Sequence, residues 1–144
     1  MPEFIKTLSC LKQVSQLIRI HNRVWPGSIG IIEALVESDE CFLAVSQKGN
    51  VLAYAFVEMD KKGGFAELQD ITVDPDHQGK GIGNELLRRI MDEYGYVKLM
   101  ARISKESLMQ FYQKHGFATE MVVENYYGID EDGARMVWRR NQTD

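Results

Sequence analysis

A short glycine-rich stretch, Gln78–Gly83 (QGKGIG), joins two segments of different periodicity and constrains the fold more than any other feature of the chain. The segment before it, FAELQDITV, carries β-branched and aromatic residues and predicts a strand. Asp74-Pro75 ends that strand, because proline has no N–H for a sheet ladder. After the glycines, apolar residues recur at helical spacing up to about Tyr94. The sequence therefore predicts a strand, a flexible turn and a helix in direct succession.

The glycine-rich turn has the properties of an anion-binding site. A helix N-terminus leaves backbone N–H groups unpaired and carries the positive end of the helix dipole. Gly79, Gly81 and Gly83 let an anion approach the main chain, and Gln78 and Lys80 add a donor and a positive charge. We expect a diphosphate as the ligand. The alternative is a turn that is rich in glycine for geometric reasons alone.

Two well-known phosphate-binding motifs do not match this turn. A Walker loop requires GxxxxGK followed by Ser or Thr, and the chain has no such run. A dinucleotide fingerprint requires GxGxxG in a first βαβ unit, but the glycines here have another spacing and lie in the middle of the chain. A nucleotide binder of either type remains only a third reading of the sequence.

The rest of the chain supplies further helices and strands around this turn. Lys48–Asn50 has the composition of a tight hairpin turn, Ser104 is a candidate N-cap, and Gly116 is placed to end a helix. The predicted elements are helices over about 7–23, 29–36, 83–94 and 104–115, and strands over 41–47, 51–59, 65–73, 96–103, 118–126 and 134–139. This order predicts an α/β fold with mixed strand pairing.

Length and composition favour one soluble cytoplasmic domain over residues 1–144. The chain has 144 residues, of which 44% are hydrophobic, and it contains no apolar run long enough to span a membrane. Its start, MPEFIKTLSC, lacks the pattern of a secretory signal. A net charge of −4 argues against a nucleic-acid partner. Neither the two cysteines nor the three scattered histidines have the spacing of a metal site.

The segment LQDITVDPDHQGKGIGNELLRRIM resembles the cofactor-binding motif of the GNAT superfamily of N-acetyltransferases. The family signature, (Gln/Arg)-x-x-Gly-x-(Gly/Ala), is met by Gln78, Gly81 and Gly83. A second family motif resembles SLMQFYQKHGF, with Phe111-Tyr112 in its helix and Gly116-Phe117 at its end. The resemblance implies a mixed, mostly antiparallel central sheet that is flanked by helices and splayed after the strand 65–73, the family's fourth.

This resemblance implies acetyl-CoA as the donor and a primary amine as the acceptor, joined in a direct ternary complex. The N–H groups of the turn would hold the diphosphate, and main-chain groups at the end of the preceding strand would pair with the pantetheine arm. A backbone N–H near Ile71 would polarise the thioester carbonyl. The predicted cofactor-binding residues are Ile71, Thr72, Val73, Gln78, Gly79, Lys80, Gly81, Ile82, Gly83 and Asn84.

Three residues are candidates for the proton transfers. By resemblance, Tyr112 would protonate the leaving thiolate, although a tyrosine at that place is also common as a core residue. Glu67 and Asp70 are the candidate bases, with a slight preference for Glu67 and with ordinary solvated charges as the alternative. Because an odd number of positions separates them, they face opposite sides of a regular strand unless a bulge intervenes.

The acceptor region also has a resemblance. The segment ENYYGIDEDGARMVW is similar to the corresponding part of protein N-terminal acetyltransferases, particularly the bacterial ribosomal-protein alanine type, in which the tyrosines line a peptide channel. Tyr126 and Tyr127 match that place, and Trp25 is either an acceptor wall or a core anchor. In the second family motif, Lys105 follows Ser104 at the place where this type usually has an asparagine that contacts the pantetheine. The acceptor is thus a peptide N-terminus or a small amine.

A rival reading is a non-catalytic acyl-CoA-binding sensor with the same fold. The presence of Tyr112 and of nearby carboxylates favours the enzyme over this sensor. The resemblance also allows a homodimer.

Overall fold

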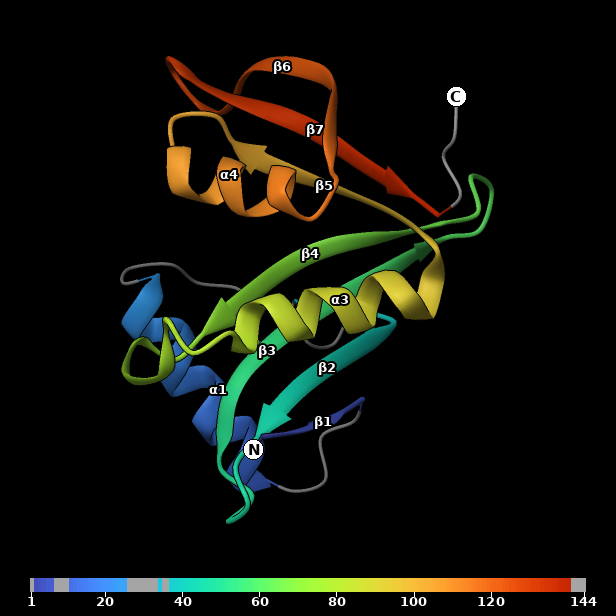
Figure 1. The fold of residues 1–144 in the computed structure, drawn as a ribbon. Helices are drawn as coiled ribbons and strands as arrows, with labels where there is room; N and C mark the ends of the chain where they lie inside the picture. Colours follow the sequence, from blue (N-terminus) through green and yellow to red (C-terminus); the bar gives the residue numbers. More distant parts are fainter. Residues whose placement is uncertain (1, 7–10, 26–33, 35–36, 141–144) are drawn as a thin grey trace. The chain divides into compact units, whose positions relative to one another are not determined.

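The computed structural model describes residues 2–6, 11–25, 34 and 37–140 (Figure 1). In chain order the elements are β1 (Glu3–Ile5), α1 (Leu11–Val24), β2 (Glu40–Val45), β3 (Val51–Asp60), β4 (Phe65–Val73), the 3-10 helix η1 (Pro75–His77), α3 (Ile82–Tyr94), β5 (Tyr96–Arg102), α4 (Glu106–Lys114), β6 (Ala118–Gly128) and β7 (Glu131–Arg139).

The strands form one mixed sheet in the order β1-β2-β3-β4-β5-β7-β6. The pairs β1–β2, β2–β3, β5–β7 and β6–β7 are antiparallel, whereas β4 and β5 are parallel. In the parallel pair, Ala66 lies opposite Val97 and Leu68 lies opposite Leu99. The predicted fold class, a mixed and mostly antiparallel sheet with flanking helices, is confirmed. Opening of the sheet beyond Leu68 stays a prediction.

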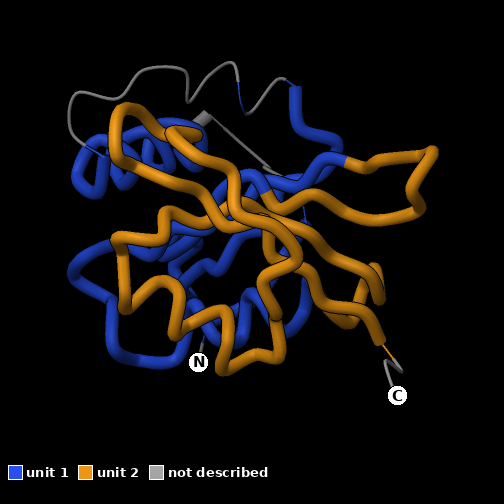
Figure 2. The backbone as a smooth tube through the Cα atoms, turned by 90° about the horizontal axis from the view of Figure 1, so that it is seen from above, with its two compact units in different colours: residues 1–58, 69–90 blue, residues 59–68, 91–144 orange. Residues whose placement is uncertain are grey.

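The chain divides into two compact units, coloured separately in Figure 2. Unit 1 comprises Met1–Glu58 and Gln69–Ile90, and unit 2 comprises Met59–Leu68 and Met91–Asp144. In unit 1, the apolar face of α1 packs on β2 and β3. Leu17 and Ile20 of that helix are fully buried in one cluster with Tyr54 of β3. Helical spacing places these two α1 side chains on one face.

Unit 2 has a core built from alternating strand positions and from α4. Val97, Leu99 and Ala101 of β5 are buried, and the residues between them are half-buried. In a strand, alternate side chains point to opposite faces, so the sequence pattern sets the buried face. At the end of α4, Gly116 has a φ of +97°, and a Cβ there would lie 3.3 Å from the ring of Trp138. The predicted helix end at this glycine is confirmed.

Two of the expected features are wrong or incomplete. The chain does not begin with a helix, because β1 precedes it and pairs with β2. Three residues are too short to show a period, so this strand is defined only by its partner. Ser104 is not the N-cap of α4, since the helix begins after Lys105 and the Ser104 hydroxyl donates to Glu131 at 3.0 Å.

The remaining predicted elements agree to within a few residues where the structure describes them. The first helix is α1, of which the predicted residues 7–10 lie outside the described part, and the predicted helix over 29–36 lies almost wholly outside it. In the described part of the chain, no helix is both long and apolar enough to cross a membrane.

Candidate active site

The connection from β4 to α3 has the predicted strand, turn and helix. Asp74 is buried just after β4, and its carboxylate accepts a hydrogen bond from the N–H of Asp76 at 3.2 Å, which shapes η1. The helix α3 begins at Ile82, one residue before the predicted start. The buried side chain of Ile82 anchors this end of the helix in the core. The first N–H groups of α3 have no partner within the helix, as at any helix N-terminus.

Gly79 and Gly81 are required by the backbone of this turn. Their φ angles are +78° and +81°, a region that residues with a Cβ rarely adopt. A Cβ at either position would meet no atom within 4 Å. The backbone angle therefore explains both glycines, and the space above them is open to a ligand.

A cavity of about 800 Å³ opens beside the turn, within unit 1. Phe4 of β1 and Ile82 contribute apolar surface, and Lys48 and Lys80 bring positive charge from two different parts of the chain. Arg89 also lines the cavity, but it is ion-paired with Glu85, another lining residue, at 3.0 Å. Positive charge of this kind suits an anionic ligand. The predicted charge of Lys80 thus lies at the edge of a real cavity.

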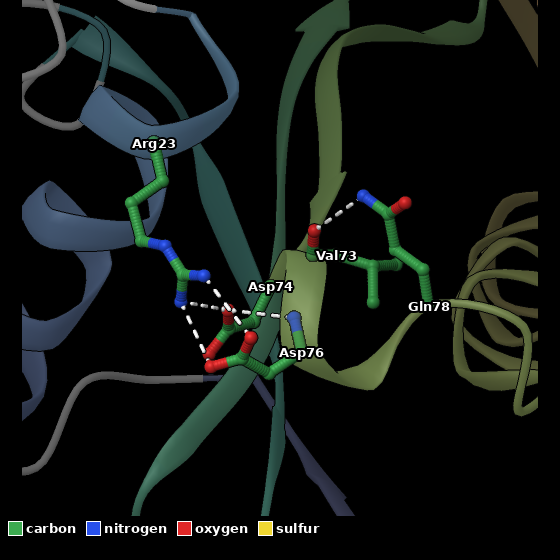
Figure 3. Close-up of polar contacts among 5 residues, drawn as sticks. All are labelled: Arg23, Val73, Asp74, Asp76 and Gln78. Atoms are coloured by element: carbon green, nitrogen blue, oxygen red, sulfur yellow. Dashed lines mark hydrogen bonds and ion pairs between the residues drawn. The ribbon is translucent and has the colours of Figure 1, made fainter.

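An arginine of α1 holds this connection in place (Figure 3). One guanidinium nitrogen of Arg23 lies 2.7 Å from Asp74 Oδ1, and another lies 3.1 Å from Asp76 Oδ1. The hydrogen bond from Arg23, followed by its charge, lowers the pKa of Asp76. Both acidic side chains just before the glycine turn are therefore tied to α1.

Gln78 has a different contact from the one expected. Its side-chain amide donates to the main-chain oxygen of Val73 at 3.2 Å (Figure 3). This hydrogen bond links the glycine turn to the end of β4, and the role of Gln78 toward a phosphate stays a prediction.

Asp70 lies at the centre of a hydrogen-bond network in unit 1. Its Oδ2 accepts from the hydroxyl of Tyr54 at 3.2 Å, and its Oδ1 accepts from the hydroxyl of Thr72 at 2.8 Å. The indole N–H of Trp25 donates to Thr72 Oγ1 at 3.2 Å. At the other end, His21 Nδ1 lies 3.0 Å from the Tyr54 hydroxyl. The network thereby joins α1, β3 and β4.

The surroundings of Asp70 make its carboxylate more basic than usual. Burial raises the pKa of Asp70, and the hydrogen bonds from Thr72 and Tyr54 oppose that rise only in part. The pKa of Tyr54 is also raised, first by burial and then by the charge of Asp70. The hydroxyl of Tyr54 therefore stays protonated and available as a donor.

Glu67, the other candidate base, is held by an ion pair in unit 2. A guanidinium nitrogen of Arg135 lies 2.6 Å from Glu67 Oε2, and the two side chains are 22% and 21% exposed. The guanidinium also lies over the ring of Phe65, with 5.7 Å to the centroid. Glu67 therefore has a cationic partner, whereas the described hydrogen-bond donors to Asp70 are two neutral hydroxyls.

The predicted acid, Tyr112, is buried on α4 in unit 2. Its ring packs edge-on against Phe111 and Phe117, at centroid distances of 5.3 Å and 5.8 Å. These contacts fix the ring in a defined position.

The tyrosine pair of β6, also in unit 2, is more accessible. Tyr126 is 52% exposed, and its ring meets that of Tyr127 at 4.9 Å. The guanidinium of Arg102 lies over Tyr127, 4.7 Å from the ring centroid. Burial, followed by the neighbouring Tyr126, raises the pKa of Tyr127. These two rings form an exposed aromatic surface.

Sequence reasoning missed three residues of these arrangements. Tyr54 lies in an apolar strand, and a buried tyrosine hydroxyl usually has a hydrogen-bond partner. The sequence could therefore have indicated that Tyr54 has a polar partner in the core. His21 is one of three scattered histidines without the spacing of a metal site, and its partner Tyr54 is 33 positions away. Arg23 gave no signal, because its partners are about fifty residues away. Trp25, 41% exposed, is not a core anchor.

Comparison with known proteins agrees with this architecture. A family model described as "Acetyltransferase (GNAT) domain" matches residues 37–119. The N-alpha-acetyltransferase RimI of Mycobacterium tuberculosis is 35% identical over 124 residues, which cover 83% of this chain and 77% of that protein. The chain spans 58–60% of the length of the first curated relatives that it matches.

Solved structures have the same fold. The ribosomal-protein-S18-alanine N-acetyltransferase from Escherichia coli has a TM-score of 0.80 at 24% identity, covering 100% of this chain and 97% of that one. An aminoglycoside 6′-N-acetyltransferase complexed with coenzyme A also has a TM-score of 0.80, at 15% identity and 99% coverage of both chains. By the match of the family model and of the mycobacterial relative, this chain belongs to the GNAT acetyltransferase family.

Proposed function

We propose that this chain is a single-domain N-acetyltransferase that moves the acetyl group of acetyl-CoA directly to a primary amine. The observation that carries the proposal is the open glycine turn at the N-terminus of α3 in a chain of the GNAT family. Backbone N–H groups and the dipole of that helix suit a diphosphate, which is the most highly charged internal group of coenzyme A.

Each part of the cofactor has an assigned partner in this proposal. The N–H groups from Gln78 to Asn84 hold the diphosphate, with Lys80 adding charge. Main-chain groups of Ile71–Val73 pair with the pantetheine arm as an added strand would. A backbone N–H near Ile71 stabilises the negative charge that develops on the thioester oxygen.

Asp70 is the proton acceptor that we favour over Glu67. A carboxylate with a raised pKa takes a proton from an ammonium more readily than one that is committed to an arginine. The amine proton passes to Asp70, and the nitrogen lone pair attacks the thioester carbonyl. The carbon–sulfur bond then breaks, and Tyr112 gives its proton to the leaving thiolate. The nitrogen loses its second proton as the amide forms, and this proton restores the Tyr112 hydroxyl.

The acceptor that we propose is a peptide α-amine. The relative from Mycobacterium tuberculosis is named an N-alpha-acetyltransferase, which favours a peptide N-terminus over a small amine. Trp25, Tyr126 and Tyr127 supply exposed or half-buried aromatic surface that would contact the first residues of the peptide.

The test is release of free CoA thiol from acetyl-CoA in the presence of a panel of acceptors. We expect release with peptides that carry a free N-terminus, and none when the same peptides are blocked at the N-terminus. Release with small amines but not with peptides would replace the proposed acceptor. Tight acetyl-CoA binding without release to any amine would favour the non-catalytic sensor.

A further inference from the structure

Tyr54 contacts the carboxylate of Asp70, and His21 contacts Tyr54; both side chains are buried in unit 1. Tyr54 is 0% exposed and His21 is 7% exposed. A buried hydroxyl or imidazole that lacked a partner would destabilise the fold, so their mutual contact is a structural requirement. The hydrogen bond from Tyr54 to Asp70 extends this pair to a candidate catalytic group.

The hydrogen bonds among these three residues have only one consistent direction while Asp70 is ionised. A carboxylate accepts hydrogen bonds and donates none, so the single hydroxyl proton of Tyr54 points to Asp70. The Tyr54 oxygen must then accept from His21, which places a proton on His21 Nδ1. The chain runs from His21 through Tyr54 to Asp70, and it orients the carboxylate.

Few other charges face this chain among the described residues. From β2, Cys41 packs nearby, and burial raises the pKa of its thiol to about 12, so it stays neutral. Arg23 of α1 is engaged by Asp74 and Asp76. His21 and Tyr54 are therefore the ionisable groups that act on Asp70.

We infer that Tyr54 and His21 are positioning residues for the proton transfer from the acceptor amine to Asp70. The hydrogen bond from Tyr54 occupies one lone pair of Asp70 Oδ2, and the contact of His21 with Tyr54 orients the donating hydroxyl. Together they fix the plane of the carboxylate. Other lone pairs remain to receive the amine proton, while the electron pair of that N–H bond stays on nitrogen. The inference rests on the proposed function, because it assumes that Asp70 is the proton acceptor.

The experiment compares wild type with Tyr54→Phe by two measurements. The first is an NMR titration of the ¹³C-labelled Asp70 carboxyl in the ligand-free protein, and the second is the pH profile of kcat/KM. Tyr54→Phe removes a donor to the ionised carboxylate, so we expect the pKa of Asp70 and the acid limb of the profile to rise together by about one pH unit. KM for acetyl-CoA should stay unchanged.

Matched variants separate positioning from a general effect on the fold. Tyr96→Phe removes a hydroxyl on β5, outside the network, and should shift neither measurement. His21→Leu should shift both in the same direction as Tyr54→Phe, whereas His21→Asn retains an N–H donor and should restore wild-type behaviour. The His21 pair also gives the answer if Tyr54→Phe does not fold.

Two failures are distinguishable. If wild type transfers no acetyl group, the proposed function is wrong. If wild type is active but the Asp70 pKa and the acid limb are the same in the Tyr54 or His21→Leu variants, the positioning role is wrong.

Discussion

Two carboxylates on one strand, three positions apart, have different partners, and this difference underlies our choice of proton acceptor. Glu67 has an arginine within 2.6 Å, while Asp70 has two hydroxyl donors and no cation bonded to it among the contacts described. A cation stabilises the ionised form strongly, whereas burial with neutral donors leaves the carboxylate more basic. We therefore propose Asp70 rather than Glu67 as the base.

Exchange of each carboxylate for its amide tests this assignment. We expect Asp70→Asn to lower kcat/KM by about 100-fold or more, the usual effect of losing a general base, and Glu67→Gln to lower it by about tenfold at most. Steady-state kinetics with a peptide acceptor measure both. The reverse ranking would identify Glu67 as the base.

Stability should respond to Asp70→Asn in a pH-dependent way. The pKa of Asp70 is raised in the folded protein, so the fold retains this proton at pH values where the unfolded chain has lost it. Wild-type stability therefore falls as pH rises through the window between the two pKa values, and the amide removes that loss. In thermal unfolding from about pH 4 to pH 7, the free energy of unfolding of Asp70→Asn should rise relative to that of wild type as the pH increases. A constant difference would contradict this expectation.

Tyr112→Phe tests the proposed acid with little change in packing, because the ring contacts to Phe111 and Phe117 remain. We expect kcat to fall by about 100-fold and KM for acetyl-CoA to change little, since only the proton donor is lost. Tyr96→Phe serves as the control. Full turnover in Tyr112→Phe would assign the proton to another donor.

At the scale of the elements, the glycine turn and α3 form the unit that we propose to bind the diphosphate, and α1 supports it. The backbone angles of Gly79 and Gly81 turn the chain into the helix, and Ile82 fixes the first turn of that helix in the core. Arg23 holds the preceding acidic residues. Such a turn positions its donors before a ligand arrives, which lowers the entropic cost of binding.

Gly81→Val tests this unit, and Gly64→Val is a matched control. Both glycines have positive φ, at +81° and +71°, and a Cβ at either site would meet no atom within 4 Å. Each substitution should therefore destabilise the fold by about 1–2 kcal/mol through its backbone. Only Gly81→Val should abolish acetyl-CoA binding, which calorimetry measures. Equal affinities in the two variants would show that the turn does not hold the cofactor.

At the scale of the whole molecule, binding of acetyl-CoA should stabilise the folded chain. At a concentration 100 times the Kd, the ligand adds about 2.7 kcal/mol to the free energy of unfolding. For a chain of 144 residues we expect a rise in Tm of several degrees. Thermal denaturation with acetyl-CoA, ATP and NAD in parallel measures the selectivity. A response to ATP or NAD alone would support a nucleotide binder.

The sequence by itself determined the features that depend on neighbouring residues. Apolar spacing predicted α1, α3 and α4, and glycine and proline placed the turn between β4 and α3, because these signals act within a few positions of the chain. Residues of this turn, Gln78, Gly81 and Gly83, also match the family signature. The β1 strand and the start of α4 were not predicted, since a partner strand defines the first and Glu131, far along the chain, binds Ser104 before the second.

Only the tertiary structure determined which partners surround each candidate residue. Tyr54 reaches Asp70 across 16 positions, His21 reaches Tyr54 across 33, and Arg135 reaches Glu67 across 68. The basicity of a carboxylate depends on its burial and on the partners within hydrogen-bonding distance, and folding brings those partners from distant segments. Residue types and spacing thus named two possible bases, and the contacts made by the folded chain give these two carboxylates different environments.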